Sequence, residues 1–406
     1  MSTLDQIHVL RQEMLHELTS SILPYWTNRV ADHDRGGYHG RIDGSNDIDF
    51  DGSRSAILNT RILWTFSSSY RILQKPDFFP HIQRAIDYLE NHFVDHKNGG
   101  VYWSLDANGI PLDTRKHTYA QSFAIYAYAE TFRATGSLKA RDRALELFDL
   151  LEIHAYLPEQ HAYYEAFDAE WNRLPDVRLS EQDLDAQRST NTHLHLMEAF
   201  TTLYKASPND LIRRRLIELV ELFIGPIFNK ETNHFYAFFD ASWNPVTNVY
   251  SFGHDIETVW LMMDAIQAIG DIDLTEKVKK QLLNVAEITV NEGIDSDFGG
   301  LYNTGLDGKI LDDDKHWWPQ AEAIIGFFHA FELSDDERFL DTAVTLWKFI
   351  QDKIIDHENG EWYFRVDRTG SPYQTEDKVG FWKCPYHSAR ACLEIYELTK
   401  ELVTSE

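Results

Sequence analysis

The chain has 406 residues, of which 43% are hydrophobic and 13% aromatic, enough for a large core. With 65 acidic and 38 basic residues its formal net charge is −27, which argues against nucleic acid and anionic membranes as partners because both need a basic surface. No segment has the pattern of a secretion signal or a membrane span. Only two cysteines occur, Cys384 and Cys392, and we expect both to be reduced in a cytoplasmic protein.

One short phrase recurs six times in chain order: a turn marked by Gly or Asn, a tyrosine, a strand-like run, a second turn and an apolar helix. The tyrosines are Tyr38, Tyr102, Tyr163, Tyr236, Tyr302 and Tyr363. Such a period across the whole chain indicates a repeat architecture. Because no linker interrupts the repeat, we expect a single domain over residues 1–406.

Two sets of helical segments alternate with these phrases. The set before each phrase is amphipathic and of mixed charge, and covers roughly 4–30, 77–95, 137–155, 209–228, 274–292 and 336–356. The set after each phrase is more apolar, and covers roughly 54–73, 117–135, 190–206, 253–269, 317–333 and 383–401. Six buried helices inside six amphipathic ones predict an all-α fold, an (α/α)6 barrel.

The intervening phrases read as short β-hairpins at one end of this barrel. Asn108-Gly109 and Asp307-Gly308 each separate two short strand-like runs and are typical hairpin turns. The third phrase carries an extra polar stretch from Arg178 to Arg188, which is a candidate lid or an ordinary surface loop.

Polar and large aromatic side chains collect at the first turns of the buried helices, where Leu or Ala would be expected. The six turns contain Asn59-Thr-Arg61, Lys116-His-Thr-Tyr119-Ala-Gln121, Asn191-Thr-His193-Leu-His195, Ser251-Phe-Gly-His254-Asp-Ile-Glu257, His316-Trp317-Trp318-Pro-Gln-Ala-Glu322 and Trp382-Lys-Cys-Pro-Tyr386-His387-Ser-Ala-Arg390. In the predicted barrel all six turns open onto one cavity. Histidines there suit proton transfer, since a helix N-terminus favours the neutral, basic imidazole.

Spacing suggests partners for some of these groups. His254 and Glu257 are three residues apart on one helical face, so the carboxylate is placed to orient the ring. His193 and His195 point to different sides, and only one can face the cavity. We expect no metal, because the histidines lie on separate helices without a zinc-binding spacing.

The six motifs together resemble those of the N-acylglucosamine 2-epimerase superfamily, and in particular its disaccharide-epimerising branch, from about residue 10 to 400. Ser251-Phe-Gly-His-Asp-Ile-Glu with His316-Trp-Trp-Pro-Gln-Ala-Glu is the most specific part. Cys384 and Ser388 are a small departure, since relatives often carry Gly and Asn there. The superfamily has the (α/α)6 fold that the repeat predicts.

The resemblance implies inversion of C2 in the reducing-end sugar of β-1,4-linked disaccharides of the cellobiose, mannobiose and lactose class, with no metal or redox cofactor. The ring opens, a proton leaves C2, and a cis-enediolate is reprotonated from the other face. His254 and His387 match the two proton-handling histidines, and His195 matches a third that assists ring opening or proton exchange at the oxygens. The matching substrate-binding residues are Arg61, Tyr119, Asn191, Glu257, Trp317, Trp318, Glu322 and Trp382.

Other functions use parts of the same pattern. An aldose–ketose isomerase of the mannose type shares the enediolate but returns the proton to C1. A glycoside hydrolase of this fold needs two carboxylates across the scissile bond, for which Glu257 and Glu322 are candidates, yet histidines dominate the turns. A closed barrel leaves no unpaired element at an edge to bind a second copy, so we expect a monomer.

Overall fold

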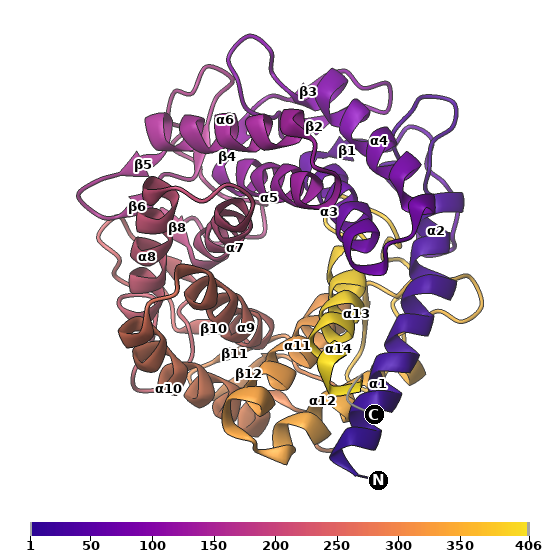
Figure 1. Cartoon of the computed structure of the whole chain (residues 1–406), viewed down its shortest axis with the longest axis vertical. Coiled ribbons are helices and arrows are strands. Elements are labelled where there is room, and N and C mark those ends of the chain that lie inside the picture. Colours follow the sequence, from indigo (N-terminus) through magenta and orange to yellow (C-terminus); the bar gives the residue numbers. More distant parts are fainter. Residues whose placement is uncertain (1, 404–406) are drawn as a thin grey trace.

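The computed structural model describes residues 2–403 and has the predicted (α/α)6 architecture (Figure 1). The inner ring consists of α3 (Ala56–Leu73), α5 (Thr118–Thr135), α7 (Thr190–Ala206), α9 (Phe252–Ile269), α11 (Trp317–Ser334) and α13 (Tyr386–Leu398). The outer ring consists of α1 (Thr3–Glu17) with α2 (Leu23–Asn28), α4 (Phe79–Tyr88), α6 (Leu138–His154), α8 (Asp210–Ile224), α10 (Ile272–Ile288) and α12 (Glu337–Phe349). The short α14 (Lys400–Val403) follows α13.

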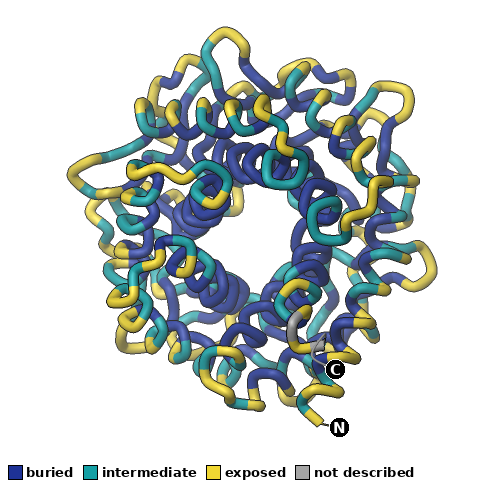
Figure 2. The backbone as a smooth tube through the Cα atoms, in the orientation of Figure 1, coloured by how far each residue is buried: buried dark blue, intermediate teal, exposed yellow. Residues whose placement is uncertain are grey.

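The two rings differ in burial as their sequences predict (Figure 2). Every residue of α3 from Ala56 to Ser69 is buried, because this helix packs on both the outer ring and its inner neighbours. In α8 one face is buried through Ile212, Leu216 and Leu219, while Arg214 on the other face is exposed. Serine caps begin three inner helices: the side chains of Ser55, Ser189 and Ser251 each accept a backbone N–H.

The outer helices are less regular than the continuous segments that the sequence predicts. Four of them end in a π-helical turn, at Leu18–Ile22, Leu89–Phe93, Thr289–Gly293 and Ile350–Ile354. In the first, Pro24 lies at the start of α2 and has no N–H to continue the α-helical bonding, so the wider turn separates α1 from α2.

Short strands link neighbouring repeats into a closed ring at one end of the barrel. The strand before an inner helix pairs with the hairpin of the following repeat: β1 (Arg54–Ser55) with β2 (Ser104–Leu105), β4 (Lys116–His117) with β7 (Ala166–Phe167), β8 (Arg188–Ser189) with β9 (Phe238–Phe239), β10 (Val249–Ser251) with β11 (Thr304–Leu306), and β13 (Lys315–His316) with β14 (Arg365–Val366). The sixth link is the bridge between Ile42 and Val379, which joins the first repeat to the last. The ring holds the N-terminal ends of the inner helices together.

The predicted hairpins are confirmed. β2 pairs with β3 (Pro111–Asp113) across Asn108-Gly109, and β11 pairs with β12 (Lys309–Asp312) across Asp307-Gly308. Asp307 and Gly308 have φ angles of 50° and 74°, the left-handed pair that a tight hairpin turn requires. A further hairpin joins β5 (Tyr156–Leu157) to β6 (Ala162–Tyr163).

Buried ion pairs repeat beneath these turns. Lys116 donates to Asp95 at 2.8 Å, Lys315 to Asp295 at 3.2 Å, and Lys378 also binds Asp356, so a lysine just before an inner helix fixes the turn of its own repeat. Both cysteines are free and buried. Between residues 2 and 403, no helix combines the length and apolar character that a bilayer crossing demands.

Candidate active site

One cavity of about 730 Å³ opens at the end of the barrel where the inner helices begin. Ten of the eleven residues that the sequence nominated line it, contributed by all six inner helices or the turns before them. They are Arg61, Tyr119, Asn191, His195, His254, Glu257, Trp317, Trp318, Trp382 and His387. The eleventh, Glu322, lies behind His387. The convergence predicted from the repeat is therefore present in the structure.

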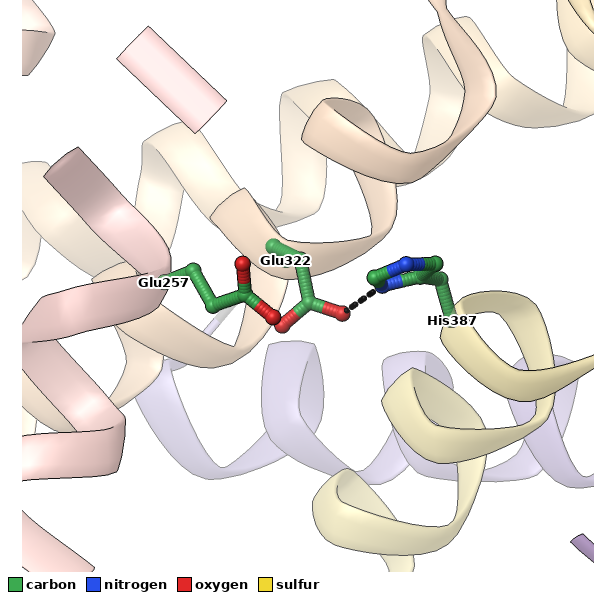
Figure 3. A group of neighbouring side chains, drawn as sticks. All are labelled: Glu257, Glu322 and His387. Atoms are coloured by element: carbon green, nitrogen blue, oxygen red, sulfur yellow. Dashed lines mark hydrogen bonds and ion pairs between the residues drawn. The ribbon is translucent and has the colours of Figure 1, made fainter. Parts of the chain in front are cut away.

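His387 is oriented by a carboxylate from the neighbouring helix (Figure 3). Its Nδ1 lies 2.7 Å from Oε1 of Glu322, which also accepts a hydrogen bond from Trp260 Nε1 at 2.9 Å through its other oxygen. Both residues are buried. Because a carboxylate only accepts, Nδ1 carries the proton and Nε2 is left as the basic nitrogen.

His195 has the same arrangement within its own helix. Its Nδ1 lies 2.8 Å from Oε2 of Glu198, and Glu198 also accepts hydrogen bonds from Tyr386 and Arg390. Burial raises the pKa of Glu198, but Arg390 and His195 outweigh it and lower the pKa to about 2. The ionised carboxylate fixes the proton of His195 on Nδ1. Its neighbour His193 points away and bonds the backbone of Ser189 and Tyr163, so it is a structural residue.

His254 differs from the other two, and here one expectation was wrong. Neither ring nitrogen bonds to another described residue, and Glu257 does not orient the ring. Glu257 instead accepts a hydrogen bond from Arg390 at 2.5 Å. A charged guanidinium makes a stronger hydrogen bond to a buried carboxyl group than a neutral imidazole does. The ring of His254 packs on Trp318, with centroids 4.8 Å apart, and Trp318 also contacts the ring of His387 at 5.6 Å.

Arg390 connects the carboxylates of this site. It is fully buried and donates to Glu198, to Glu257 and, at 2.7 Å, to Glu322. Arg61 is the second buried guanidinium, and it donates to the hydroxyl of Tyr119 at 3.0 Å. Three carboxyl groups thus face two guanidinium groups, which favours one bound proton among the carboxyls.

Burial keeps the cavity histidines neutral. It lowers the pKa of His254 to about 3, with nearby His195 adding to the effect. Burial and the charges of Arg61 and Arg390 hold the pKa of His387 well below its usual range. Burial and the proximity of Glu322 raise the pKa of Glu257 well above that of a free carboxyl. We place the shared proton of these two carboxyls on Glu257, because Glu322 accepts the greater number of hydrogen bonds.

Several buried polar atoms at the cavity have no hydrogen-bond partner within residues 2–403. They are Nε of Arg61, Oε2 of Glu257, Oδ1 of Asn191, Nε1 of Trp317 and Nε2 of His316. Buried polar groups are normally satisfied, so donors and acceptors of this kind around an aromatic cavity suit a ligand rich in hydroxyl groups. Trp317, Trp318 and Trp382 supply flat apolar surfaces beside them.

The polar stretch after the third hairpin borders the cavity. Leu179, Ser180, Gln182 and Asp183 line it, and Leu179 and Asp183 also line an adjoining chamber of about 310 Å³. The stretch runs without a helix or strand until β8. Its position is that of the candidate lid, and closure remains a prediction.

The described residues contain one buried cluster of possible metal ligands, and its contacts do not suit a metal ion. Glu257, Glu322 and His387 bring one ligand atom each within 4.8 Å of one another (Figure 3). However, Arg390 already binds both carboxylates, and the Nδ1 proton of His387 points at Glu322. A divalent cation there would lie against a fixed guanidinium.

Sequence reasoning did not nominate Glu198 or Trp260, and it singled out Arg390 only for its three-residue spacing from His387. Glu198 and Arg390 each follow a cavity histidine by three residues, so the helical spacing that paired His254 with Glu257 was also present there. Trp260 reads as an ordinary core residue of an apolar helix, and only the contact with Glu322 reveals its place.

Comparisons with known proteins identify the family of the chain. The family model of N-acylglucosamine 2-epimerase (GlcNAc 2-epimerase) matches residues 36–391. A cellobiose 2-epimerase of Bacteroides fragilis is 41% identical over 95% of this chain and 98% of its own. The solved cellobiose 2-epimerase of Bacillus thermoamylovorans superposes with a TM-score of 0.91 at 36% identity, over 96% of this chain and all of the other. A D-mannose isomerase of Marinomonas mediterranea is more distant, at 24% identity over 84% of this chain and 86% of its own.

Proposed function

The chain belongs to the N-acylglucosamine 2-epimerase family, and on that premise we propose that it is a cellobiose 2-epimerase, which interconverts glucose and mannose at the reducing end of β-1,4-linked disaccharides. One observation supports the chemistry above all. His254 and His387 come from different helices and contact the same ring, that of Trp318, in one cavity. Inversion at a carbon needs two such proton carriers on opposite sides of it.

In the proposed reaction one histidine takes a proton from C2 and the other histidine gives a proton to C2. In one direction neutral His387 takes the proton from C2 of the open-chain aldose, and the C–H electrons form the cis-enediolate. Protonated His254 then gives its proton to the other face of C2: the electrons of the C1–C2 double bond form the new C–H bond, and a lone pair on O1 restores the C1 carbonyl. The two histidines together carry one added proton both before and after the reaction, and they exchange roles in the reverse direction. The free site holds its added proton on Glu257, so the proposed reaction requires that proton to reach His254 once the substrate is bound.

Ring opening and charge stabilisation are assigned to the neighbouring groups. Nε2 of His195 takes the proton of the anomeric hydroxyl and returns it to the ring oxygen, since Glu198 keeps the other ring nitrogen protonated. Arg61 faces the cavity with a guanidinium suited to the negative oxygens of the enediolate. Tyr119, Asn191, Glu257 and Glu322 bind hydroxyls or hold these groups in place.

The aromatic walls support a disaccharide rather than a single sugar. Trp317 and Trp318 lie beside the histidines, and Trp382 lies across the cavity mouth against Tyr119 and Trp103. Tryptophan faces pack on the apolar faces of pyranose rings. We assign the reducing-end sugar to the histidine side, and the second sugar to the region of Trp382.

The test is an incubation of cellobiose with chelator-treated protein in deuterated water, followed by NMR. We expect glucosyl-mannose with deuterium at C2, and His387→Asn should lower kcat by about 10²- to 10⁴-fold while the sugar still binds. A ketose as sole product would assign the mannose-type isomerase reaction instead. Free glucose would assign hydrolysis.

A further inference from the structure

A second cavity, which we call the rear cavity, lies at the opposite end of the barrel lumen and has a volume of about 260 Å³. Its walls come from the C-terminal halves of α3, α5, α7, α9 and α13. The lining residues are Trp64, Arg71, Tyr126, Glu130, Arg133, Glu198, Thr202, Lys205, Trp260, Leu261, Asp264, Glu394, Glu397 and Leu398. Arg71, Lys205 and Asp264 are partly exposed, so this cavity reaches solvent without passing the substrate cavity.

The rear cavity suits water. Its lining is charged, and Nε1 of Trp64 is a buried donor with no acceptor in the described part of the chain. Glu394 also lines it and bonds to no other described residue. A polar cavity of this volume has room for several water molecules, each of which takes roughly 30 Å³ in the liquid.

Glu198 connects the two cavities through its hydrogen bond to His195. Glu198 lines the rear cavity, while its Oε2 holds Nδ1 of His195, which lines the substrate cavity. Both side chains are only 3% exposed. Among the rear-cavity residues described, Glu198 alone bonds directly to a histidine of the substrate cavity, since Trp260 reaches His387 only through Glu322. The Arg390 guanidinium lies 4.7 Å from the indole of Trp260 in the same partition.

We propose that Glu198 is a positioning residue that also links His195 to rear-cavity water, which gives the histidine a route for proton exchange while a disaccharide fills the cavity mouth. The proposal rests on the proposed function, in which His195 handles the protons of ring opening. When Nε2 accepts the anomeric hydroxyl proton, the Nδ1 proton passes to Oε2 of Glu198. Glu198 then gives a proton to rear-cavity water and returns to the carboxylate, and the reverse sequence reloads His195.

Chemical rescue tests this route. Glu198→Ala removes the carboxylate, and we expect kcat for cellobiose to fall by about 10²-fold with KM within about twofold. Added formate should restore at least a tenth of kcat, with chloride at equal ionic strength as the control. Because formate enters from the rear, its effect should be noncompetitive with cellobiose. Competitive behaviour, or no rescue in a folded variant, would overturn the proposal.

A second substitution closes the rear cavity. Thr202→Leu places a larger apolar side chain on its wall, whereas Thr135→Leu makes the same change near that end of the barrel but off the cavity. Rescue by formate should be lost in Glu198→Ala with Thr202→Leu, and kept in Glu198→Ala with Thr135→Leu. Equal rescue in both double variants would contradict a rear route.

Two further measurements keep the test decisive. If circular dichroism shows that Glu198→Ala does not fold, the single variants decide: Thr202→Leu should lower kcat about tenfold at unchanged KM, and equal kcat for Thr202→Leu and Thr135→Leu refutes the route. If the unaltered protein does not convert cellobiose at all, the proposed function fails on its own, and rescue is measured with mannose as substrate.

Discussion

Arg390 is the single residue on which the charge balance of the site depends. Its guanidinium is fully buried and binds the carboxylates of Glu198, Glu257 and Glu322, two of which hold cavity histidines. Without it, like charges would face one another away from water. We expect Arg390→Met to lower the free energy of unfolding by about 3–5 kcal/mol, because removing one partner of a buried ion pair leaves the other uncompensated. Urea denaturation measures this loss.

A surface arginine provides the comparison. Arg338 also binds two carboxylates, those of Glu287 and Asp336, but its side chain is 59% exposed. Arg338→Met should change the free energy of unfolding by at most about 1 kcal/mol, since water screens exposed pairs. A similar loss for both variants would show that the burial of Arg390 has no special weight.

The site also shows which residue-level inferences a sequence supports. Helical spacing identified the cavity face of each helix, because the side chains there interrupt an apolar pattern. It assigned Glu257 to His254 wrongly, and it gave no means of pairing Glu322 with His387, since that contact joins two helices 65 positions apart in the chain. Contacts between helices depend on packing distances that a spacing rule does not contain.

At the scale of elements, the helices α9 and α11 approach closely at one glycine. A Cβ atom added to Gly326 would lie 2.4 Å from the carbonyl oxygen of Ile256, one residue before Glu257. Gly326→Ala would therefore push apart the helices that carry His254 and Trp318. We expect a loss of about 1–3 kcal/mol in the free energy of unfolding from overpacking. We also expect kcat to fall, and steady-state kinetics with cellobiose measures that fall.

Gly270 offers a control in which only the backbone is strained. It ends α9 with φ of 69°, and an added Cβ would meet no atom within 4 Å. Gly270→Ala should destabilise the protein through its left-handed backbone, yet leave kcat unchanged. If the two alanine variants affect kcat equally, helix separation is not the cause.

The elements themselves were largely predictable. Apolar segments alternate with amphipathic ones, and each predicted inner range lies within a few residues of an observed inner helix. The π-helical turns and the ring of short strands were not predictable, because two-residue strands carry no periodicity. The bridge from Ile42 to Val379 is the plainest case, since it joins opposite ends of the chain.

Across the whole molecule, many buried histidines are held neutral, which ties stability to pH. Burial lowers the pKa of His117 and His254 to about 3, and that of His193, His316 and His329 to about 4. His117 shows why: Nε2 bonds the carbonyl of Val177, and Nδ1 accepts the N–H of Tyr119, so a second ring proton would break the latter bond. Burial acts oppositely on Glu165 and Glu394, whose pKa it raises to about 7.

These shifts predict a protein whose stability begins to fall as the pH drops below 6.5, because the histidines outnumber the glutamates that offset them. Each histidine has a pKa near 6.5 when unfolded, so below pH 6.5 the unfolded chain binds more protons and the free energy of unfolding falls, by about 1.4 kcal/mol per pH unit for each group. Between pH 7 and 4.5 the buried glutamates offset part of this, because the folded protein binds more protons at those carboxyls. Below pH 4.5 these glutamates are protonated in both states and no longer compensate.

Thermal unfolding followed by circular dichroism from pH 7 to 3.5 tests this prediction. We expect Tm to fall from about pH 6.5 downward, and to fall more steeply near pH 4.5, where the glutamates stop compensating. His117→Gln should lower Tm at pH 7, because it disturbs the bonds to Val177 and Tyr119, but should flatten the fall in acid, since one titrating group is gone. Curves for the variant and the unaltered chain that run parallel below pH 4.5 would mean that His117 does not contribute to the acid sensitivity.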